Sequence, residues 1–281
     1  MPSEIPPAAE VAPPHRTASR SDAPVDATGK AGSGGAASAV AEHAPDGAGT
    51  PGETKPTPAA ALDQEHAPFR WTVDAQETES QRRSRRIVNA SPAACRAELR
   101  RRKLAVSALG GNVAGVATPV RLTGELRGVR FVTPGKKSVY GILDCRLAIV
   151  LDELAELLLA QGVVAVHVDN FYRPRAHLPG SRKKSQHAYG LAIDIYGVTL
   201  ADGTTLVVER DFNGTVGAVP CGPDAALGPD GDARALALRN VVCAIARSRL
   251  FNYLLTPNYD AAHRNHVHAD VGRGGTEHVL R

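Results

Sequence analysis

The chain reads SQHAYGLAIDIY at residues 185–196, and this stretch predicts a polar turn followed directly by an apolar strand. Successive side chains of a strand point to opposite faces of its sheet, so Ile193 and Ile195 lie on one face and Asp194 on the other. Gly190 suits a tight turn before the strand, because a side chain there would crowd the chain. Further along, NHVHAD at residues 265–270 alternates in the same way. Each stretch therefore predicts a strand with one apolar and one polar face.

Side chains of the types that bind metal ions lie on the polar faces of these two strands and in the turn before the first. His187 and Asp194 come from the first stretch, whereas His266, His268 and Asp270 share a face of the second. A catalytic zinc ion usually has three protein ligands from His, Asp, Glu or Cys and keeps a fourth position for water. His187, Asp194 and His268 complete such a set. The helical His-Glu-x-x-His signature is absent from the sequence, and each histidine taken alone is typical of an ordinary hydrogen-bonded residue.

Both motifs, together with the pair Tyr172-Arg173 upstream, resemble those of the zinc peptidases that cleave D-alanyl peptides in bacterial cell walls. More closely, residues 91–272 are similar to the extensin-like C-terminal domain family, within the superfamily of zinc D-Ala-D-Ala peptidases and Hedgehog-like proteins. This resemblance implies a periplasmic or extracellular location and peptidoglycan peptides as the partner.

The same resemblance implies zinc as the cofactor and His187, Asp194 and His268 as its ligands. It makes His266 a candidate base and Arg173 the group that binds substrate or stabilises the oxyanion. The chemistry asks for the same parts, because an imidazole with a pKa near neutrality can accept a proton from water. A fixed guanidinium can stabilise the negative charge that develops on the carbonyl oxygen.

Asn265 departs from the superfamily pattern, in which many relatives have a glutamate base three residues before the last zinc ligand. An amide has no lone pair basic enough to accept the proton. The base is therefore open between His266 and His263, with His266 favoured because it shares the face of His268. Asp270 either orients one of these imidazoles or is a solvated carboxylate at a strand end.

The leading hypothesis is a zinc metallopeptidase that hydrolyses bonds in peptidoglycan stem peptides or crosslinks, of either the carboxypeptidase or the endopeptidase type. The alternative is a catalytically inactive, zinc-containing module that binds the cell wall, and Asn265 favours it. A basic structural protein of the wall is a third class, which only the long tail and the pI of about 9.0 favour. Nucleic acid is not expected as a partner, because few aromatic residues lie among the basic ones.

Composition divides the chain into three parts. Residues 1–68 contain no Phe, Trp or Tyr and hold 11 of the 20 prolines, so we expect a disordered tail. We expect a basic linker over 69–90 and the zinc peptidase-like domain over 91–281. No signal peptide is visible at the start of the chain, and no stretch has the length and hydrophobicity of a membrane span.

Within the domain, apolar spacing, caps and turn residues indicate an α+β fold with a small antiparallel sheet flanked by helices, similar to Hedgehog and D-Ala-D-Ala peptidases. A basic loop over 169–185 is expected to form one rim of the cleft. The predicted helices cover 91–104, 147–161 and 233–249. The predicted strands are short ones within 116–132, a buried strand over 163–168, and a hairpin over 191–200 and 204–209.

The four cysteines show no Cys-x-x-Cys spacing, which argues against zinc-ribbon and thioredoxin-like sites. Their order favours the disulfides Cys95–Cys145 and Cys221–Cys243 in an exported protein, although four cysteines allow three pairings. Free buried thiols in a cytosolic protein are the alternative.

Overall fold

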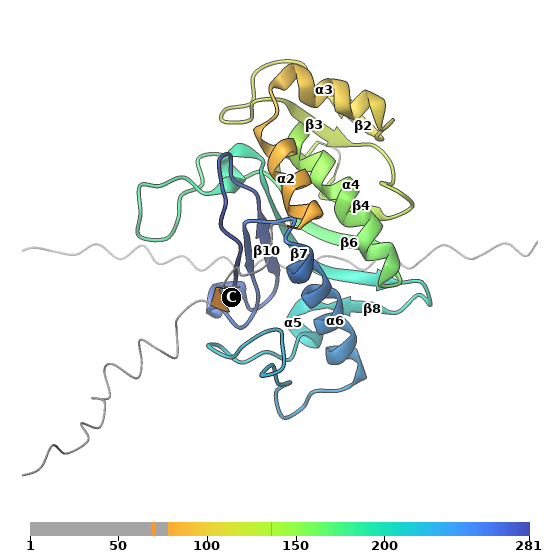
Figure 1. The fold of residues 1–281 in the computed structure, drawn as a ribbon, viewed down its shortest axis with the longest axis vertical. Helices are drawn as coiled ribbons and strands as arrows, with labels where there is room; N and C mark the ends of the chain where they lie inside the picture. Colours follow the sequence, from red (N-terminus) through yellow and green to blue (C-terminus); the bar gives the residue numbers. More distant parts are fainter. Residues whose placement is uncertain (1–68, 71–77, 136) are drawn as a thin grey trace, which may run out of the picture. The chain divides into compact units, whose positions relative to one another are not determined.

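The computed structural model describes residues 69–70, 78–135 and 137–281, so the expected disordered tail lies outside the described residues. The described part is a mixed α+β structure with two sheets and several helices (Figure 1). The helices are α2 (Glu79–Asn89), α3 (Pro92–Arg101), α4 (Cys145–Ala160), α5 (Val208–Asp211) and α6 (Ala233–Ser248), and the 3-10 turns are η1 (Val139–Gly141), η2 (Gln186–Tyr189) and η3 (Ala261–His263).

The larger sheet has eight strands within the described residues, in the order β1-β11-β9-β10-β7-β6-β4 with β8 paired to β7. The strands are β1 (Phe69–Arg70), β4 (Arg130–Val132), β6 (Val163–Asn170), β7 (Ala192–Leu200), β8 (Thr205–Val207), β9 (Tyr253–Leu255), β10 (Val267–Asp270) and β11 (Val279–Leu280). The pairs β4–β6 and β9–β11 are parallel. The expected small antiparallel sheet was therefore wrong in size and partly in direction, because strands of two or three residues are too short to show an alternating pattern.

A second, antiparallel sheet contains β2 (Val106–Ala108), β3 (Pro119–Leu122) and β5 (Leu143–Asp144). The strands expected within 116–132 thus divide between the two sheets, since β3 joins this one and β4 joins the larger one. The expected second strand of the hairpin is shorter than predicted, and residues 208–211 form α5 instead. The carboxylate of Asp211 accepts a hydrogen bond from the backbone N–H of Val207 and so ends the strand.

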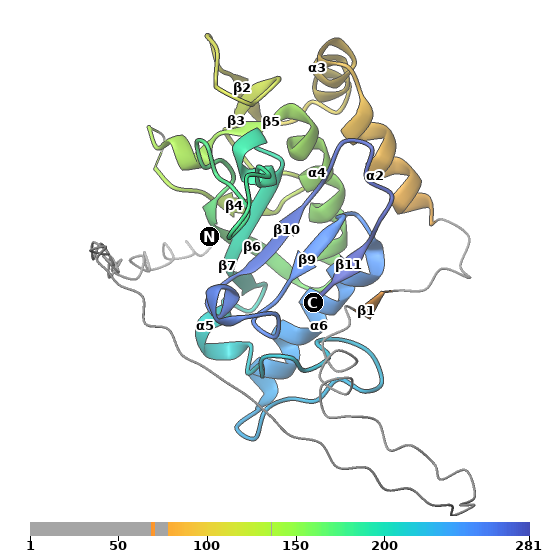
Figure 2. The same ribbon diagram turned by 90° about the vertical axis from the view of Figure 1, so that its left-hand side faces the viewer.

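The pairing of β7 with β10 gives the larger sheet its two faces. Asp194 lies opposite His268, and Ile193 lies opposite Ala269. Directly opposed residues of an antiparallel pair share a face, so the first pair lies on one face and the second on the other. Ile193 and Ala269 belong to the hydrophobic core, which α4 and α6 cover behind the strands in Figure 2. We call the opposite face, which carries Asp194 and His268, the site face.

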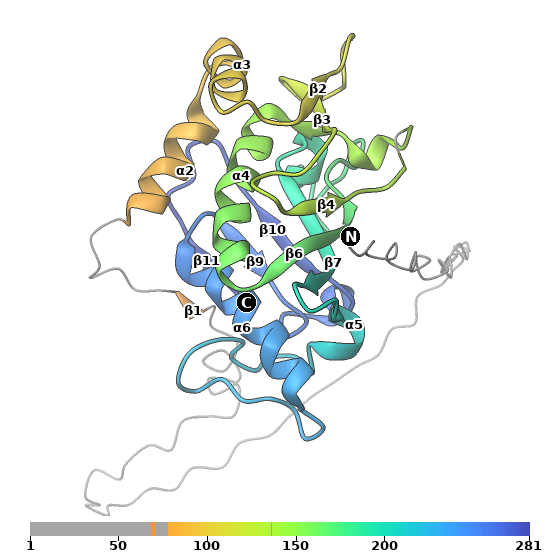
Figure 3. The same ribbon diagram turned by 90° about the vertical axis from the view of Figure 1, so that its right-hand side faces the viewer.

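Helix α4 runs through the core, where α2 and α3 pack against it (Figure 3). It covers Cys145–Ala160, close to the predicted 147–161, and the backbone N–H of Arg146 donates to the side chain of its N-cap, Asp144. The predicted apolar stripe is confirmed, with Leu151 and Leu154 fully buried. The helix is buried on its polar side as well, which the stripe alone did not predict.

Residues 79–89, expected within a basic linker, instead form helix α2. Its N-terminus has a capping box, in which the Thr78 hydroxyl accepts from the backbone N–H of Gln81 and the Gln81 side chain accepts from that of Thr78. Ile87 and Val88 are buried in the hydrophobic core. The helix is therefore part of the folded domain. Its many arginines made its short apolar side hard to recognise in the sequence.

Buried carboxylates of α4 pair with arginines from the segments around it. Asp152 lies 2.8 Å from Nη1 of Arg102 and 3.1 Å from Nε of Arg127. Glu153 pairs with Arg102 and, at 2.6 Å, with Arg83. We call these five residues the ion cluster. Each of its carboxylates has two guanidinium partners, so the buried charge is compensated within the protein.

Two disulfides join Cys95 to Cys145 and Cys221 to Cys243, which confirms the predicted pairing. The first ties α3 to the start of α4, and the second ties the loop before α6 to that helix. A disulfide typically contributes about 2–4 kcal/mol by restricting the unfolded chain. Among the described helices, none combines the length and hydrophobicity that a membrane span requires.

Candidate metal centre

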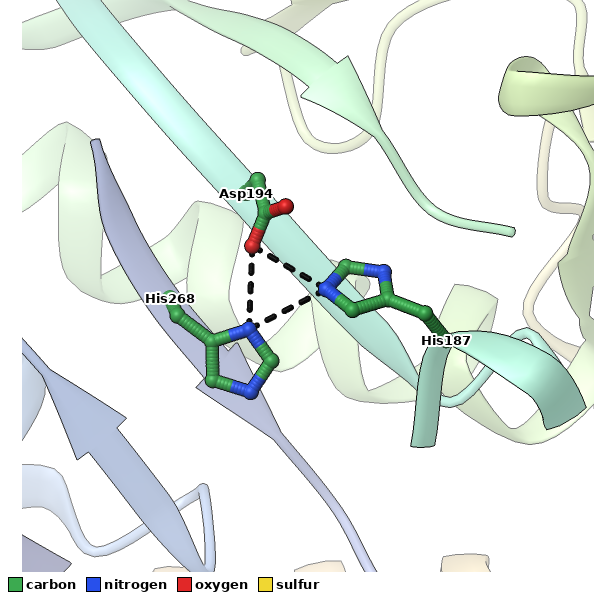
Figure 4. A group of neighbouring side chains, drawn as sticks. All are labelled: His187, Asp194 and His268. Carbon is green, nitrogen blue, oxygen red and sulfur yellow. Dashed lines mark hydrogen bonds and ion pairs between the residues drawn. The ribbon is translucent and has the colours of Figure 1, made fainter. Parts of the chain in front are cut away.

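Three side chains from separate segments point towards one another on the site face (Figure 4). Nε2 of His187 lies 3.0 Å from Oδ1 of Asp194 and 3.1 Å from Nδ1 of His268, and the last two atoms are 2.9 Å apart. A tetrahedral zinc ion with bonds of 2.0–2.1 Å would separate its ligand atoms by about 3.3 Å. The three predicted ligands are therefore brought together with a spacing close to what such an ion requires. We call these three side chains the candidate metal centre, or metal centre for short.

Local structure explains how these side chains meet. The hydroxyl of Ser185 accepts from the backbone N–H of His187 and caps the turn η2. Gly190 follows with a φ of +65°, and a Cβ added to it would lie 2.9 Å from the backbone nitrogen of Asp144. The predicted tight turn is thus confirmed, and it leads directly into β7. The register between β7 and β10 then places Asp194 opposite His268.

The outward-facing atoms of the metal centre are held by the surrounding structure. Nδ1 of His187 lies 3.0 Å from the carbonyl oxygen of Phe171, and Nε2 of His268 lies 3.1 Å from Oδ2 of Asp270. Each imidazole donates its outer N–H to an oxygen, which leaves the other nitrogen facing the centre. Nδ2 of Asn170 donates to Oδ2 of Asp194 at 2.9 Å. Histidine ligands of metal ions are commonly fixed by outer partners of this kind.

Burial and close charges shift the pKa values of all three ligands. Burial lowers the pKa of His187. For His268, burial also acts to lower the pKa, but hydrogen bonds with Asp194 and Asp270 outweigh it and raise the pKa to about 9. Burial would raise the pKa of Asp194, yet the two histidines hold it well below its usual range. The centre therefore combines a carboxylate that stays ionised with an imidazole, that of His268, which holds a proton more strongly than an ordinary histidine.

His266 and His263 lie beside the metal centre but differ in position. Nε2 of His266 is 3.7 Å from Oδ1 of Asp194, and its Nδ1 is 2.9 Å from Oδ1 of Asn265. The ring of His263 lies 5.1 Å from that of His266, and its Nδ1 pairs with Asp260 at 2.7 Å. His266 lies just before β10, so its predicted place within the strand is wrong by one residue, although its ring still reaches the centre.

Arg173 comes from the segment that follows β6. Its Nη2 lies 3.9 Å from Oδ2 of Asp194, and 46% of its side chain is exposed. Its backbone N–H donates to the carbonyl of His187, which ties this segment to the ligand turn. Arg173 therefore lies near Asp194, and its predicted role in binding substrate or stabilising the oxyanion stays a prediction.

Sequence reasoning missed three groups that support the centre. These are the amide of Asn170, the carbonyl of Phe171 and the carboxylate of Asp260. A backbone carbonyl leaves no sequence signal, and Asn170, the last residue of β6, lies beyond the strand predicted over 163–168. Asp260 did carry a signal, because an Asp three residues before His263 is typical of a capped helical turn. Asp270 does pair with an imidazole, but with that of His268 and not with that of His263 or His266, as the sequence had suggested.

The comparisons with known proteins place the chain in a family. The model described as Extensin-like protein C-terminus matches residues 93–279, a span that contains all three ligands of the metal centre. No curated protein and no solved structure matches the chain. The matched span covers most of the folded part and more than half of the sequence. The chain therefore belongs to the extensin-like C-terminal family.

Proposed function

We propose that this domain is a zinc-dependent peptidase that hydrolyses peptide bonds in peptidoglycan stem peptides or their crosslinks. The observation that carries the proposal is the convergence of one carboxylate oxygen and two imidazole nitrogens within 2.9–3.1 Å of one another. Two His and one carboxylate are a common ligand set of catalytic zinc in hydrolases. A structural zinc site would usually have four protein ligands, whereas this one has three.

The donor set fits a divalent cation in chemistry as well as in spacing. Burial disfavours the charged form of the Asp194 carboxylate, and a cation at the centre would compensate that charge. The raised pKa of His268 means that a metal would replace a proton, which is the usual exchange when a metal binds. A bound zinc ion supplies a Lewis acid that polarises a carbonyl and makes water more acidic.

His266 is placed to accept the proton of the attacking water. Asn265 lies at Nδ1 of His266 and fixes an N–H there, so Nε2 faces Asp194 with a free lone pair. Burial lowers the pKa of His266, which keeps the ring neutral and able to take up a proton. The same nitrogen then passes the proton to the leaving amine. His263 is the weaker candidate because its closest charged partner is Asp260 rather than a ligand.

Arg173 is placed to bind the substrate carbonyl as negative charge develops on it. Its guanidinium lies near Asp194 without a close ion pair, so donors remain for a substrate oxygen. The hydrogen bond from the backbone N–H of Arg173 to the carbonyl of His187 holds the start of this segment at the metal centre. A fixed cation at this position would stabilise the oxyanion more than the neutral carbonyl.

We further propose that the domain works in the periplasm or outside the cell. The two disulfides support this location, because disulfides persist in oxidising compartments and are rare in the cytosol. Stem peptides of peptidoglycan are the substrate class that the family resemblance implies. Their free carboxylates match the exposed arginine beside the metal centre.

The test is hydrolysis of purified peptidoglycan by the zinc-loaded protein, followed by mass spectrometry of the products. His266→Ala should keep its zinc and its fold but lose about 10²- to 10⁴-fold in turnover, the range typical of general acid-base catalysis. His263→Ala is the matched control and should lose much less. Zinc content and melting temperature are measured on the same samples.

Each result bears on a separate part of the proposal. Turnover like that of the wild type in His266→Ala, with a large loss in His263→Ala, would move the base to His263. A zinc-loaded wild type that binds peptidoglycan but releases no product would contradict the peptidase and favour a binding module.

A further inference from the structure

A basic arm projects beside the metal centre. We define it as residues 173–184, the green loop that extends to the left of β10 in Figure 1. An antiparallel bridge pairs His177 with Lys184, and the backbone N–H of Leu178 donates to the carbonyl of Lys183 at 2.9 Å. All arm residues except the half-buried Ala176 are exposed. The arm is therefore a small hairpin that presents its side chains to solvent.

The charge of the arm is entirely of one sign. Residues 170–193 contain no Asp or Glu, whereas the arm carries its cations at Arg173, Arg175, Arg182, Lys183 and Lys184. In the described part of the chain, only Arg173 of these five has an ion-pair partner, at the long distance of 3.9 Å. The ion cluster, by contrast, pairs each of its arginines with a carboxylate. The arm therefore has a positive field that the described protein does not neutralise.

The base of the arm has an unfavourable backbone conformation. The backbone N–H of Ala176 donates to the carbonyl of Arg173, which closes a turn with Pro174 and Arg175 at its centre. Arg175 has a φ of +61°, where glycine or asparagine is favoured because an ordinary side chain crowds the backbone. Glycine would suit the turn better, so the arginine at this position is held in a strained backbone conformation.

The arm is also fixed to the metal centre at both ends. The backbone N–H of Arg173 donates to His187 at its start, and that of Ser185, just after the arm, donates to Ala176. Ser185 in turn caps the turn that carries His187. A polymer bound by the arm would therefore be held next to the metal centre.

We propose that the arm binds the anionic groups of a cell-wall polymer and holds that polymer at the metal centre. Both carboxylates of stem peptides and phosphates of wall polymers offer the required anions. The proposal deepens the proposed peptidase function and rests on it for the identity of the polymer. Nucleic acid fits the arm less well, because the arm has no Phe, Tyr or Trp on which a base could stack.

The experiment measures binding of the full chain to purified sacculi by co-sedimentation, which needs no turnover. A triple variant, Arg182→Ser, Lys183→Ser and Lys184→Ser, should bind on the order of fivefold more weakly for each charge removed. Binding by the wild type should fall as salt is raised from about 0.05 M to about 0.3 M, because surface attraction is screened.

Arg175→Gly separates binding from folding. Glycine relieves the positive φ, so the melting temperature should stay unchanged or rise, while binding to sacculi falls about fivefold. Lys103→Gly is the matched control, since Lys103 is also an exposed cation with a positive φ, of 53°, at the end of α3. It should leave binding unchanged.

Chemically treated sacculi identify the anion. Loss of binding after removal of phosphate-linked polymers would assign phosphate, and loss after amidation of free carboxylates would assign carboxylate, and either result supports the proposal. Wild-type binding by both Arg175→Gly and the triple variant would overturn it, as would tighter binding to single-stranded DNA than to sacculi. If sacculi bind through the arm but are not cleaved, the peptidase proposal fails while the arm's role stands.

Discussion

The ion cluster and the metal centre both bury charged side chains, but only the ion cluster is complete by itself. In the ion cluster, Arg102 and Arg127 donate directly to Asp152, so donors and acceptors satisfy one another. In the metal centre, the imidazoles donate outwards to surrounding oxygens and turn their other nitrogens towards the carboxylate. Buried charged groups thus form a self-compensating network in one place and, in the other, the cluster for which we propose a bound cation.

Proton exchange separates the two regions further. Burial acts to lower the pKa of Arg102, but hydrogen bonds with Glu98 and Asp152 outweigh it and raise the pKa, so the guanidinium stays charged. His268 has a pKa raised to about 9. Its proton can still be lost when a metal ion takes its place. A buried group that can give up its proton can take a metal instead, and a guanidinium cannot.

Matched substitutions of two equally buried aspartates should affect different properties, zinc binding in one case and the free energy of unfolding in the other. Asp194→Asn removes a ligand charge, so zinc affinity should fall by more than about 100-fold. Asp152→Asn removes a buried charge and leaves the half-buried Arg102 and the exposed Arg127 short of a partner, so the free energy of unfolding should fall by up to about 3 kcal/mol while zinc binding persists. The measurements are zinc titration and urea unfolding of both variants beside the wild type. Equal losses of zinc in both variants would remove the distinction between the two regions.

Substitutions of Asp270 test how much the residues around the metal centre contribute to zinc affinity. Asp270→Ala removes the acceptor that orients His268 and should weaken zinc binding by about 10- to 100-fold. Asp270→Asn keeps an acceptor oxygen and should recover part of this loss. Calorimetric zinc titration gives all three affinities. An alanine variant with wild-type affinity would return Asp270 to the role of a solvated carboxylate.

The smallest predicted effect is the response of Glu98 to acid. Its hydrogen bond with Arg101, helped by Arg102, lowers the pKa of Glu98 to about 2, although burial opposes the shift. The unfolded carboxyl takes up a proton near its ordinary pKa, so this stabilisation is complete above about pH 4.5 and is lost as the pH falls towards 2. Because the side chain is partly exposed, the contribution should be about 1 kcal/mol.

Unfolding of the wild type and of Glu98→Gln at pH 7, 4 and 2.5 checks this expectation. The difference between the two proteins should shrink as the pH falls. A difference that stays constant with pH would mean that the ion pair contributes nothing specific to stability.

The metal centre was largely predictable because its residues are carried by a strong local pattern. Alternation along residues 191–196 and 265–270 assigned Asp194 and His268 to polar faces before the register between the strands was known. Helix α4 was predictable for a similar reason, since its leucines recur at helical spacing. Both disulfides followed the order of the cysteines along the chain.

The parts that were not predictable depend on contacts between distant segments. One end of the larger sheet is made by β1 and β11, strands of two residues each, which are defined by their pairing with segments elsewhere in the chain. Helix α2 buries Ile87 and Val88 but is otherwise rich in arginine, which resembles a linker. Asn170 supports Asp194 from another strand, so no spacing along the chain links the two residues.

The most direct test of the metal centre is the zinc content of the purified wild-type protein. Inductively coupled plasma mass spectrometry after dialysis against zinc should find about one zinc per chain. His268→Ala, measured in parallel, should retain little zinc while its disulfides stay intact. Zinc far below one equivalent in the wild type, or the same zinc content in wild type and His268→Ala, would contradict the assignment of His187, Asp194 and His268 as a metal centre.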